Sequence, residues 1–249
     1  MQYGICNLSI VPLRFEASDA SEMVSQVLYG EIFKIIEQRK SWSKIRLAFD
    51  KYEGWIDNKQ YIEITEDEYK NLYQQDLRLS SDLVEFIQDK NNHLYPISLG
   101  SSLNGLSLLD HTFDGRFSDK KRPKEALIET AFSYLNAPYL WGGKTPFGID
   151  CSGFTQMVYK LNGYKILRDA SQQATQGDAL SFIEESEPGD LAFFDNNEGN
   201  IVHVGIIMKD NYIIHAHGKV RIDRLDHSGI YNVDSKMHTH KLRVIKKII

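Results

Sequence analysis

The chain has 249 residues, of which 42% are hydrophobic and 25% are charged, and its net charge is −5. This composition is typical of a soluble globular protein and leaves room for one to three domains. The acidic balance argues against a nucleic-acid-binding protein. No run approaches the roughly 18 apolar residues that a membrane-spanning helix needs, so we expect neither a nucleic-acid partner nor a membrane span.

Two cysteines, Cys6 and Cys151, lie far apart in the sequence. They form no C-x-x-C pair and have no zinc-site spacing, so we expect no disulfide framework, no metal and no cofactor. This cysteine usage fits a reducing compartment. The first residues lack a basic segment followed by an apolar one, which a secretory leader would have. We therefore expect a cytoplasmic protein, or a periplasmic or secreted one if a leader has been removed.

Residues 1–63 alternate apolar and polar positions in short runs, with Gly30 and the Asp50-Lys51 region as turns. Several short strands in so short a segment indicate a small β-barrel.

Residues 64–118 are expected to hold a linker helix and a second, reduced β module. The run "TEDEYKNLYQQ" places Thr65 and Glu68 at the spacing of a capping box. Residues 83–112 then return to short strand-like runs broken by turn residues.

Residues 119–249 are expected to form an α+β domain, with helices packed on an antiparallel sheet. Residues 125–136 have helical spacing, and a second helix begins at Asp150 or Cys151 and stops at Asn162-Gly163. Later runs rich in β-branched and aromatic residues predict strands at 190–195, 201–208, 211–218 and 240–248.

Cys151 is the first candidate for chemistry, because a helix start surrounds its sulfur with unpaired backbone N–H groups. That placement favours the nucleophilic thiolate, although the charge of the capping residue Asp150 opposes it. Ser152 and Gly153 leave the first turn uncrowded. A buried, inert cysteine is equally compatible with the helix position alone.

A cysteine nucleophile needs a base, and the base needs a partner that fixes its tautomer. His203 lies in "IVHVGII" and His215 in "YIIHA", with a turn expected at 209–211. Their even separation places both side chains on one face of an antiparallel hairpin. His217 has the same parity and competes for the partner role. The other histidines are expected at the surface: His93, His111, His227, His238 and His240.

Transition-state charge in acyl transfer needs hydrogen-bond donors. The backbone N–H of Cys151 is one candidate, and Tyr139, just upstream, is the nearest phenol.

The motifs "APYLWGG", "GIDCSGF", "RDASQQ", "EPGDLAFF" and "VHVGIIM…YIIHAHG" resemble, in order and spacing, the NlpC-type cell-wall cysteine peptidases. The resemblance covers Lys124 to about Ile248 and implies a papain-like cysteine peptidase domain. It assigns the nucleophile to Cys151, the base to His203, its orienting partner to His215 and an oxyanion donor to Tyr139.

The front half, with "SEMVSQVLYGE" and "EGWID", is similar to bacterial SH3-like domains. "PISLGSSLNG" resembles the reduced second module of the γ-D-glutamyl-L-diamino-acid endopeptidases, which act on peptidoglycan stem peptides bearing a free N-terminal L-Ala. The resemblance implies that Asp169, with Glu22 and Trp55, holds the alanine ammonium. The remaining pocket residues that it implies are Ser152 and Ser171 for the D-glutamate carboxylate, Trp141 as lining, and Asp150.

Other interpretations remain open at this point. From the residues alone, Asp169 and Asp150 are helix caps, Glu22 is a loop charge, and Trp55 is a barrel core residue. The leading hypothesis is a cytoplasmic murein-recycling peptidase. A secreted hydrolase of intact wall and a non-catalytic wall-binding protein are the alternatives.

Overall fold

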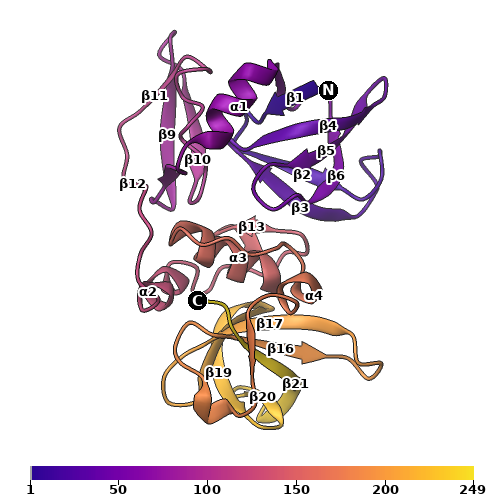
Figure 1. Cartoon of the computed structure of the whole chain (residues 1–249), viewed down its shortest axis with the longest axis vertical. Helices are drawn as coiled ribbons and strands as arrows, with labels where there is room; N and C mark the ends of the chain where they lie inside the picture. Colours follow the sequence, from indigo (N-terminus) through magenta and orange to yellow (C-terminus); the bar gives the residue numbers. More distant parts are fainter. Residues whose placement is uncertain (1) are drawn as a thin grey trace. The chain divides into compact units, whose positions relative to one another are not determined.

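A computed structural model describes residues 2–249 and divides the chain into two compact units. Unit 1 is Met1–Lys120 and unit 2 is Lys121–Ile249 (Figure 1). The two units are described in turn.

Unit 1 begins with a seven-stranded antiparallel sheet in the order β3-β2-β6-β5-β4-β1-β7. Alternate residues of its strands face a common core that includes Val11, Leu13, Val27, Phe33 and Ile45. The strands are β1 (Gln2–Ile5), β2 (Ile10–Arg14), β3 (Met23–Leu28), β4 (Ile32–Gln38), β5 (Trp42–Leu47), β6 (Glu53–Asp57) and β7 (Ile62–Ile64).

Helix α1 (Glu66–Gln74) has the capping box that the sequence predicts. The Thr65 hydroxyl accepts from the backbone N–H of Glu68, and Glu68 Oε2 accepts from the backbone N–H of Thr65 at 2.7 Å. Tyr69 is buried and its ring lies 4.5 Å from that of Tyr3 on β1. This contact attaches the helix to the first sheet.

The rest of unit 1 is a smaller β module around Tyr29, Ile87, Ile97 and Leu103. It has a three-stranded sheet, β10-β9-β11, and a two-stranded one, β12-β8. The strands are β8 (Leu79–Ser80), β9 (Val84–Asp89), β10 (Leu94–Ser98), β11 (His111–Phe113) and β12 (Phe117–Ser118). The expectation that His111 lies at the surface is wrong, because β11 brings its Nδ1 within 2.8 Å of the buried Tyr29 hydroxyl.

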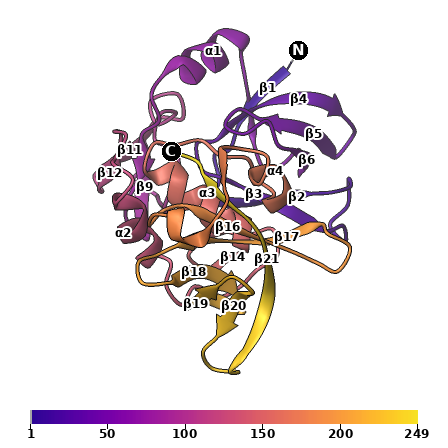
Figure 2. The ribbon, with the colours of Figure 1, turned by 60° about the horizontal axis from the view of Figure 1, so that its bottom comes forward.

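Unit 2 contains a sheet in the order β15-β21-β16-β17-β18-β19-β20. Because β20 also pairs with β21, six of the strands close into a ring (Figure 2). The strands are β15 (Asp178–Leu180), β16 (Leu191–Asp195), β17 (Ile201–Ile207), β18 (Tyr212–His217), β19 (Lys219–Asp226), β20 (Gly229–Asn232) and β21 (Met237–Lys247).

The helices of unit 2 are α2 (Ala126–Phe132), α3 (Cys151–Leu161) and α4 (Ala170–Gln173), with a 3₁₀ turn at Ile183–Glu185. A short hairpin, β13 (Lys144–Thr145) and β14 (Gly148–Ile149), precedes α3. Helix α3 packs against β17 and β18. This packing places the start of α3 beside the histidine-bearing strands.

The predicted α+β architecture of the second half, preceded by small β modules, is confirmed. The bounds of α3 agree with the sequence prediction, with Asp150 as N-cap and Gly163 at φ +80° just beyond the end. The first predicted helix of this domain is shorter than expected. It ends at Phe132, and the chain then turns until Asn136 donates its N–H to Val220 on β19.

Candidate active site

Cys151 is the first residue of α3, and its side chain is buried. Asp150 caps the helix, because its Oδ1 accepts from the backbone N–H of Gly153 at 2.6 Å. The predicted cap is therefore confirmed. The cap fixes the direction in which the first turn presents the sulfur.

A buried ion pair holds the Asp150 carboxylate. Arg168, 1% exposed, donates from Nη1 to Oδ1 at 2.9 Å and from Nη2 to Oδ2 at 2.7 Å. The backbone N–H of Gly142 also donates to Oδ2, at 2.8 Å. One carboxylate thus joins the loop before β13, the start of α3 and the segment before α4. Sequence reasoning gave Arg168 no role, because a buried arginine is recognised only once its partner is known.

Gly153 and Gly143 allow this loop to lie against the helix start. A Cβ on Gly153 would lie 2.3 Å from the carbonyl oxygen of Gly143, and a Cβ on Gly143 would lie 2.3 Å from that of Gly148. Both distances are far below van der Waals contact, so a side chain at Gly153 would displace the loop from the first turn of α3, and one at Gly143 would displace β14.

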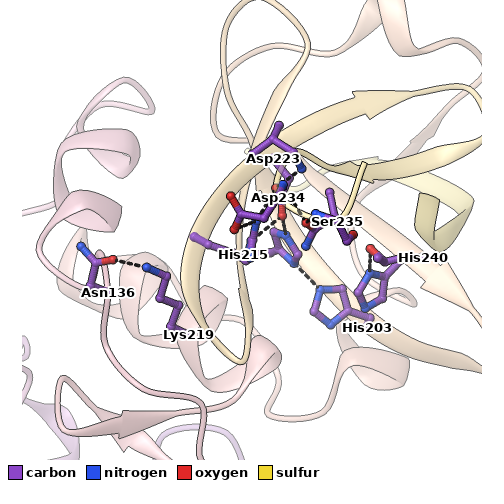
Figure 3. A network of polar contacts seen from close by, with 12 residues as sticks. Asn136, His203, His215, Lys219, Asp223, Asp234, Ser235 and His240 are labelled. Carbon is purple, nitrogen blue, oxygen red and sulfur yellow. Dashed lines mark hydrogen bonds and ion pairs between the residues drawn. The ribbon is translucent and has the colours of Figure 1, made fainter. Parts of the chain in front are cut away.

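His203 on β17 and His215 on β18 lie side by side, as Figure 3 shows. His203 Nε2 and His215 Nδ1 are 2.8 Å apart, and both residues are buried. Their even spacing correctly predicts a shared face. His215 pairs with Gly205, so the two histidines are diagonal neighbours across the hairpin. His217 is exposed and its ring centre is 6.4 Å from that of His203, so His215 is the hydrogen-bond partner.

His240 is not a surface residue, and the expectation that it is one is wrong. Its ring stacks on His203, with centroids 4.1 Å apart and an angle of 25° between the planes. Closure of the sheet causes this contact, because β21 returns past β16 to pair with β20. Burial, followed by the charges of His215 and His217, lowers the pKa of His240 to about 3.

Burial also affects the charge of Cys151 and His203, the candidate nucleophile and base. It raises the pKa of the Cys151 thiol to about 12, and the neighbouring Asp150 charge adds to that rise. Hydrogen bonds from the backbone of Val204 and Ser152 lower the pKa, but by less than burial raises it. Burial, followed by His215, lowers the pKa of His203 well below its ordinary value. Both shifts favour the uncharged forms, a thiol at Cys151 and a neutral imidazole at His203. The helix dipole alone would favour a thiolate, but the loss of solvation on burial has the larger effect and favours the thiol.

Tyr139 lies next to β14, where it forms a bridge with Ile149, and its backbone N–H donates to the carbonyl of Gly218 at 3.0 Å. Burial, followed by the charges of Cys151 and Asp150, raises the pKa of its phenol to about 12. The hydroxyl keeps its proton at neutral pH and is able to donate it in a hydrogen bond.

The other predicted pocket residues of unit 2 differ in exposure. Ser152 is buried, and its hydroxyl contacts Asp150 Oδ1 at 3.3 Å and Arg168 Nη1 at 3.0 Å. Asp169 is half-buried at the N-cap of α4, Ser171 is exposed, and Trp141 is 61% exposed. Their binding roles stay predictions.

The two pocket residues predicted in the front half lie in unit 1. Glu22 is exposed. Trp55 is buried on β6, with the Arg39 guanidinium 4.1 Å above its ring. Their roles in substrate binding also stay predictions.

Asp223 on β19 was missed by sequence reasoning. Its Oδ2 lies 3.0 Å from His215 Nε2, and both side chains are fully buried. The sequence does contain a signal for Asp223. The alternating run "KVRIDRLD" follows β18 after a turn at Gly218. The even separation of 8 residues from His215 puts both side chains on the same face of the sheet.

Comparison with known proteins decides the family. Residues 136–240 match the NlpC/P60 family. The chain is 30% identical over 217 residues to the γ-D-glutamyl-L-lysine dipeptidyl-peptidase of Bacillus subtilis, a match that covers 77% of this chain and 71% of that protein. The chain belongs to the NlpC/P60 family of cysteine peptidases.

Residues 13–60 of this NlpC/P60 peptidase match the bacterial dipeptidyl-peptidase Sh3 domain. A probable endopeptidase p60 of Listeria welshimeri is 38% identical over 104 residues, which cover 41% of this chain and 20% of that protein. The fold is similar to the crystal structure of an NlpC/P60 family protein from Bacillus cereus, with a TM-score of 0.77, 19% identity and 99% coverage of both chains.

Within residues 2–249, no group of three or more His, Cys, Asp and Glu side chains is arranged to hold a metal ion. In the same part of the peptidase, no helix is both long and apolar enough to cross a membrane.

Replacing Arg168 with Met should destabilise the NlpC/P60 domain by about 3–5 kcal/mol, because the Asp150 charge would stay buried without its partner. Urea denaturation followed by circular dichroism measures the loss. Glu129→Gln is the control, since Glu129 pairs with Arg122 at the surface and its loss should cost less than about 1 kcal/mol. Equal effects of the two substitutions would contradict a structural role for the buried pair.

The Cys151 thiol should stay protonated up to at least about pH 9, since its pKa is raised above that of an ordinary cysteine. A ¹³Cβ resonance of labelled cysteine reports the charge directly, and Cys151→Ala identifies the signal against that of Cys6. A thiolate shift at neutral pH that disappears in His203→Ala would instead demonstrate a preformed thiolate–imidazolium pair.

Proposed function

We propose that this peptidase hydrolyses the γ-D-glutamyl-L-diamino-acid bond of short peptidoglycan stem peptides that carry a free N-terminal L-Ala. The observation that carries the proposal is the extent of the match to the Bacillus subtilis dipeptidyl-peptidase. That match covers 77% of this chain, which is more than either unit contains, so it extends into both units. The match to the Listeria p60 protein covers only 41%.

The proposed reaction is a two-step acyl transfer at Cys151. His203 takes the thiol proton as the sulfur attacks the γ-glutamyl carbonyl carbon. The Tyr139 hydroxyl and the Cys151 N–H stabilise the resulting oxyanion. His203 then gives the proton to the leaving amine, and a water molecule hydrolyses the thioester.

The lowered pKa of His203 supports its role as a general base. An imidazole whose pKa is lowered remains unprotonated at neutral pH, so it is ready to accept a proton. The raised pKa of Tyr139 supports its role as an oxyanion donor, because a protonated phenol is able to donate a hydrogen bond in the transition state.

Selectivity for a free amine is proposed to come from Asp169. An ammonium group that leaves water requires a carboxylate partner, and an acylated amine has no positive charge for that carboxylate to stabilise. In intact wall the L-Ala amine is acylated by the glycan. We therefore propose peptides already released from the wall as the substrates, with cytoplasmic recycling as the setting.

Cleavage of L-Ala-γ-D-Glu-L-Lys and its diaminopimelate counterpart, followed by chromatography, tests the function. Each peptide is compared with its N-acetylated form. The free peptides should be cleaved at least about 100-fold faster, because the acetylated ones bring no ammonium charge to the Asp169 carboxylate. Cys151→Ala should abolish cleavage of both.

Asp169→Asn should reduce the preference for the free amine, whereas Asp178→Asn, the same change at an exposed carboxylate of β15, should leave it unchanged. Equal cleavage of the free and acetylated peptides by the wild-type enzyme would refute the ammonium pocket and favour a hydrolase of intact wall.

A further inference from the structure

Asp223 lies at the end of a buried row of polar groups that begins at the base. Its carboxylate is 3.0 Å from His215 Nε2, and His215 Nδ1 is in turn 2.8 Å from His203 Nε2 (Figure 3). All three side chains are buried. The row crosses three adjacent strands, β17, β18 and β19, so its geometry is set by the sheet.

The direction of each hydrogen bond in this row follows from the carboxylate. An ionised carboxylate only accepts, so His215 must donate from Nε2. A neutral imidazole carries one N–H, which leaves His215 Nδ1 as an acceptor. His203 must then donate from Nε2, and its own lone pair is on Nδ1.

Three donors keep the Asp223 carboxylate ionised. Arg221 donates from Nε to Oδ2 at 2.7 Å and from Nη2 to Oδ1 at 2.9 Å, and the backbone N–H of Val233 donates to Oδ1 at 3.0 Å. Burial raises the pKa of Asp223, but the hydrogen bonds from His215, Arg221 and Val233 outweigh it, and the pKa lies well below its ordinary value.

We infer that Asp223 is a positioning residue that sets the tautomer of both histidines and so makes Nδ1 of His203 the atom that receives the proton. The inference rests on the proposed function in assigning the Cys151 proton to His203. Without a carboxylate at this position, a pair of neutral imidazoles has two opposite arrangements of N–H groups. In one of them His203 presents an N–H where the base needs a lone pair.

The contacts of Asp223 predict what an amide would do in its place. In Asp223→Asn, an NH₂ group at the Oδ1 position would face two donors, Arg221 Nη2 and the N–H of Val233, and neither is able to accept. At the Oδ2 position it would face Arg221 Nε and His215 Nε2. Of these groups, only His215 Nε2 becomes an acceptor, once the proton of His215 moves to Nδ1. The amide should therefore orient its NH₂ toward His215 and reverse both tautomers.

Asp234→Asn is a matched control. Asp234 is a largely exposed carboxylate that also pairs with Arg221, at 2.9 Å from Nη2. The substitution removes the same charge from the same arginine without changing a contact of His215.

The experiment is long-range ¹H–¹⁵N NMR of the full-length protein with labelled histidine, without substrate. Wild type and Asp234→Asn should have the proton on Nε2 of both His203 and His215, whereas Asp223→Asn should have it on Nδ1 of both. Cleavage of L-Ala-γ-D-Glu-L-Lys by Asp223→Asn, measured well below the melting temperature of the variant, should fall on the order of 10³–10⁴-fold.

A wild-type spectrum with the proton on His215 Nδ1 would overturn the inference without any variant, so it stays testable if Asp223→Asn fails to fold. Unchanged tautomers and full activity in Asp223→Asn would also overturn it. Absence of cleavage by the wild type would refute the proposed substrate while leaving the NMR result to decide the role of Asp223.

Discussion

Burial of Cys151 and His203 is the constraint on which the chemistry of this peptidase depends. It removes the water that would stabilise a thiolate or an imidazolium, and the pKa of each group moves toward its neutral form. In the proposed reaction, an uncharged thiol and an uncharged imidazole react only if the proton has a defined path from the sulfur to the nitrogen. The position of every nearby hydrogen then matters, and the surrounding structure determines those positions.

Two buried carboxylates fix the two sides of that path. On the nucleophile side, Asp150 caps α3 and pairs with Arg168, so the sulfur is presented from a rigid first turn. On the base side, Asp223 accepts from His215, which contacts His203. Each carboxylate has an arginine partner that offsets the cost of its burial. The helix and the sheet thus each contribute a buried carboxylate that is paired with an arginine.

The local parts of this arrangement could be predicted from sequence. Apolar spacing and an aspartate at the cap defined α3, and even spacing put His203 and His215 on one face. Residues whose position depends on distant pairing could not be found in this way. His240 reaches His203 because β21 closes the sheet on β20, and Arg168 is buried only because Asp150 accepts from it. The thiol charge depends on burial, which periodicity does not reveal.

In the proposed reaction, Cys151 carries the γ-glutamyl group during turnover. Acid-quench mass spectrometry during cleavage of L-Ala-γ-D-Glu-L-Lys tests it most directly, because peptide mapping locates a thioester on one residue. We expect an L-Ala-γ-D-Glu acyl group on the peptide that contains Cys151, and none in Cys151→Ala. Turnover of the substrate with no acyl group on Cys151, or with the group on another residue, would contradict it.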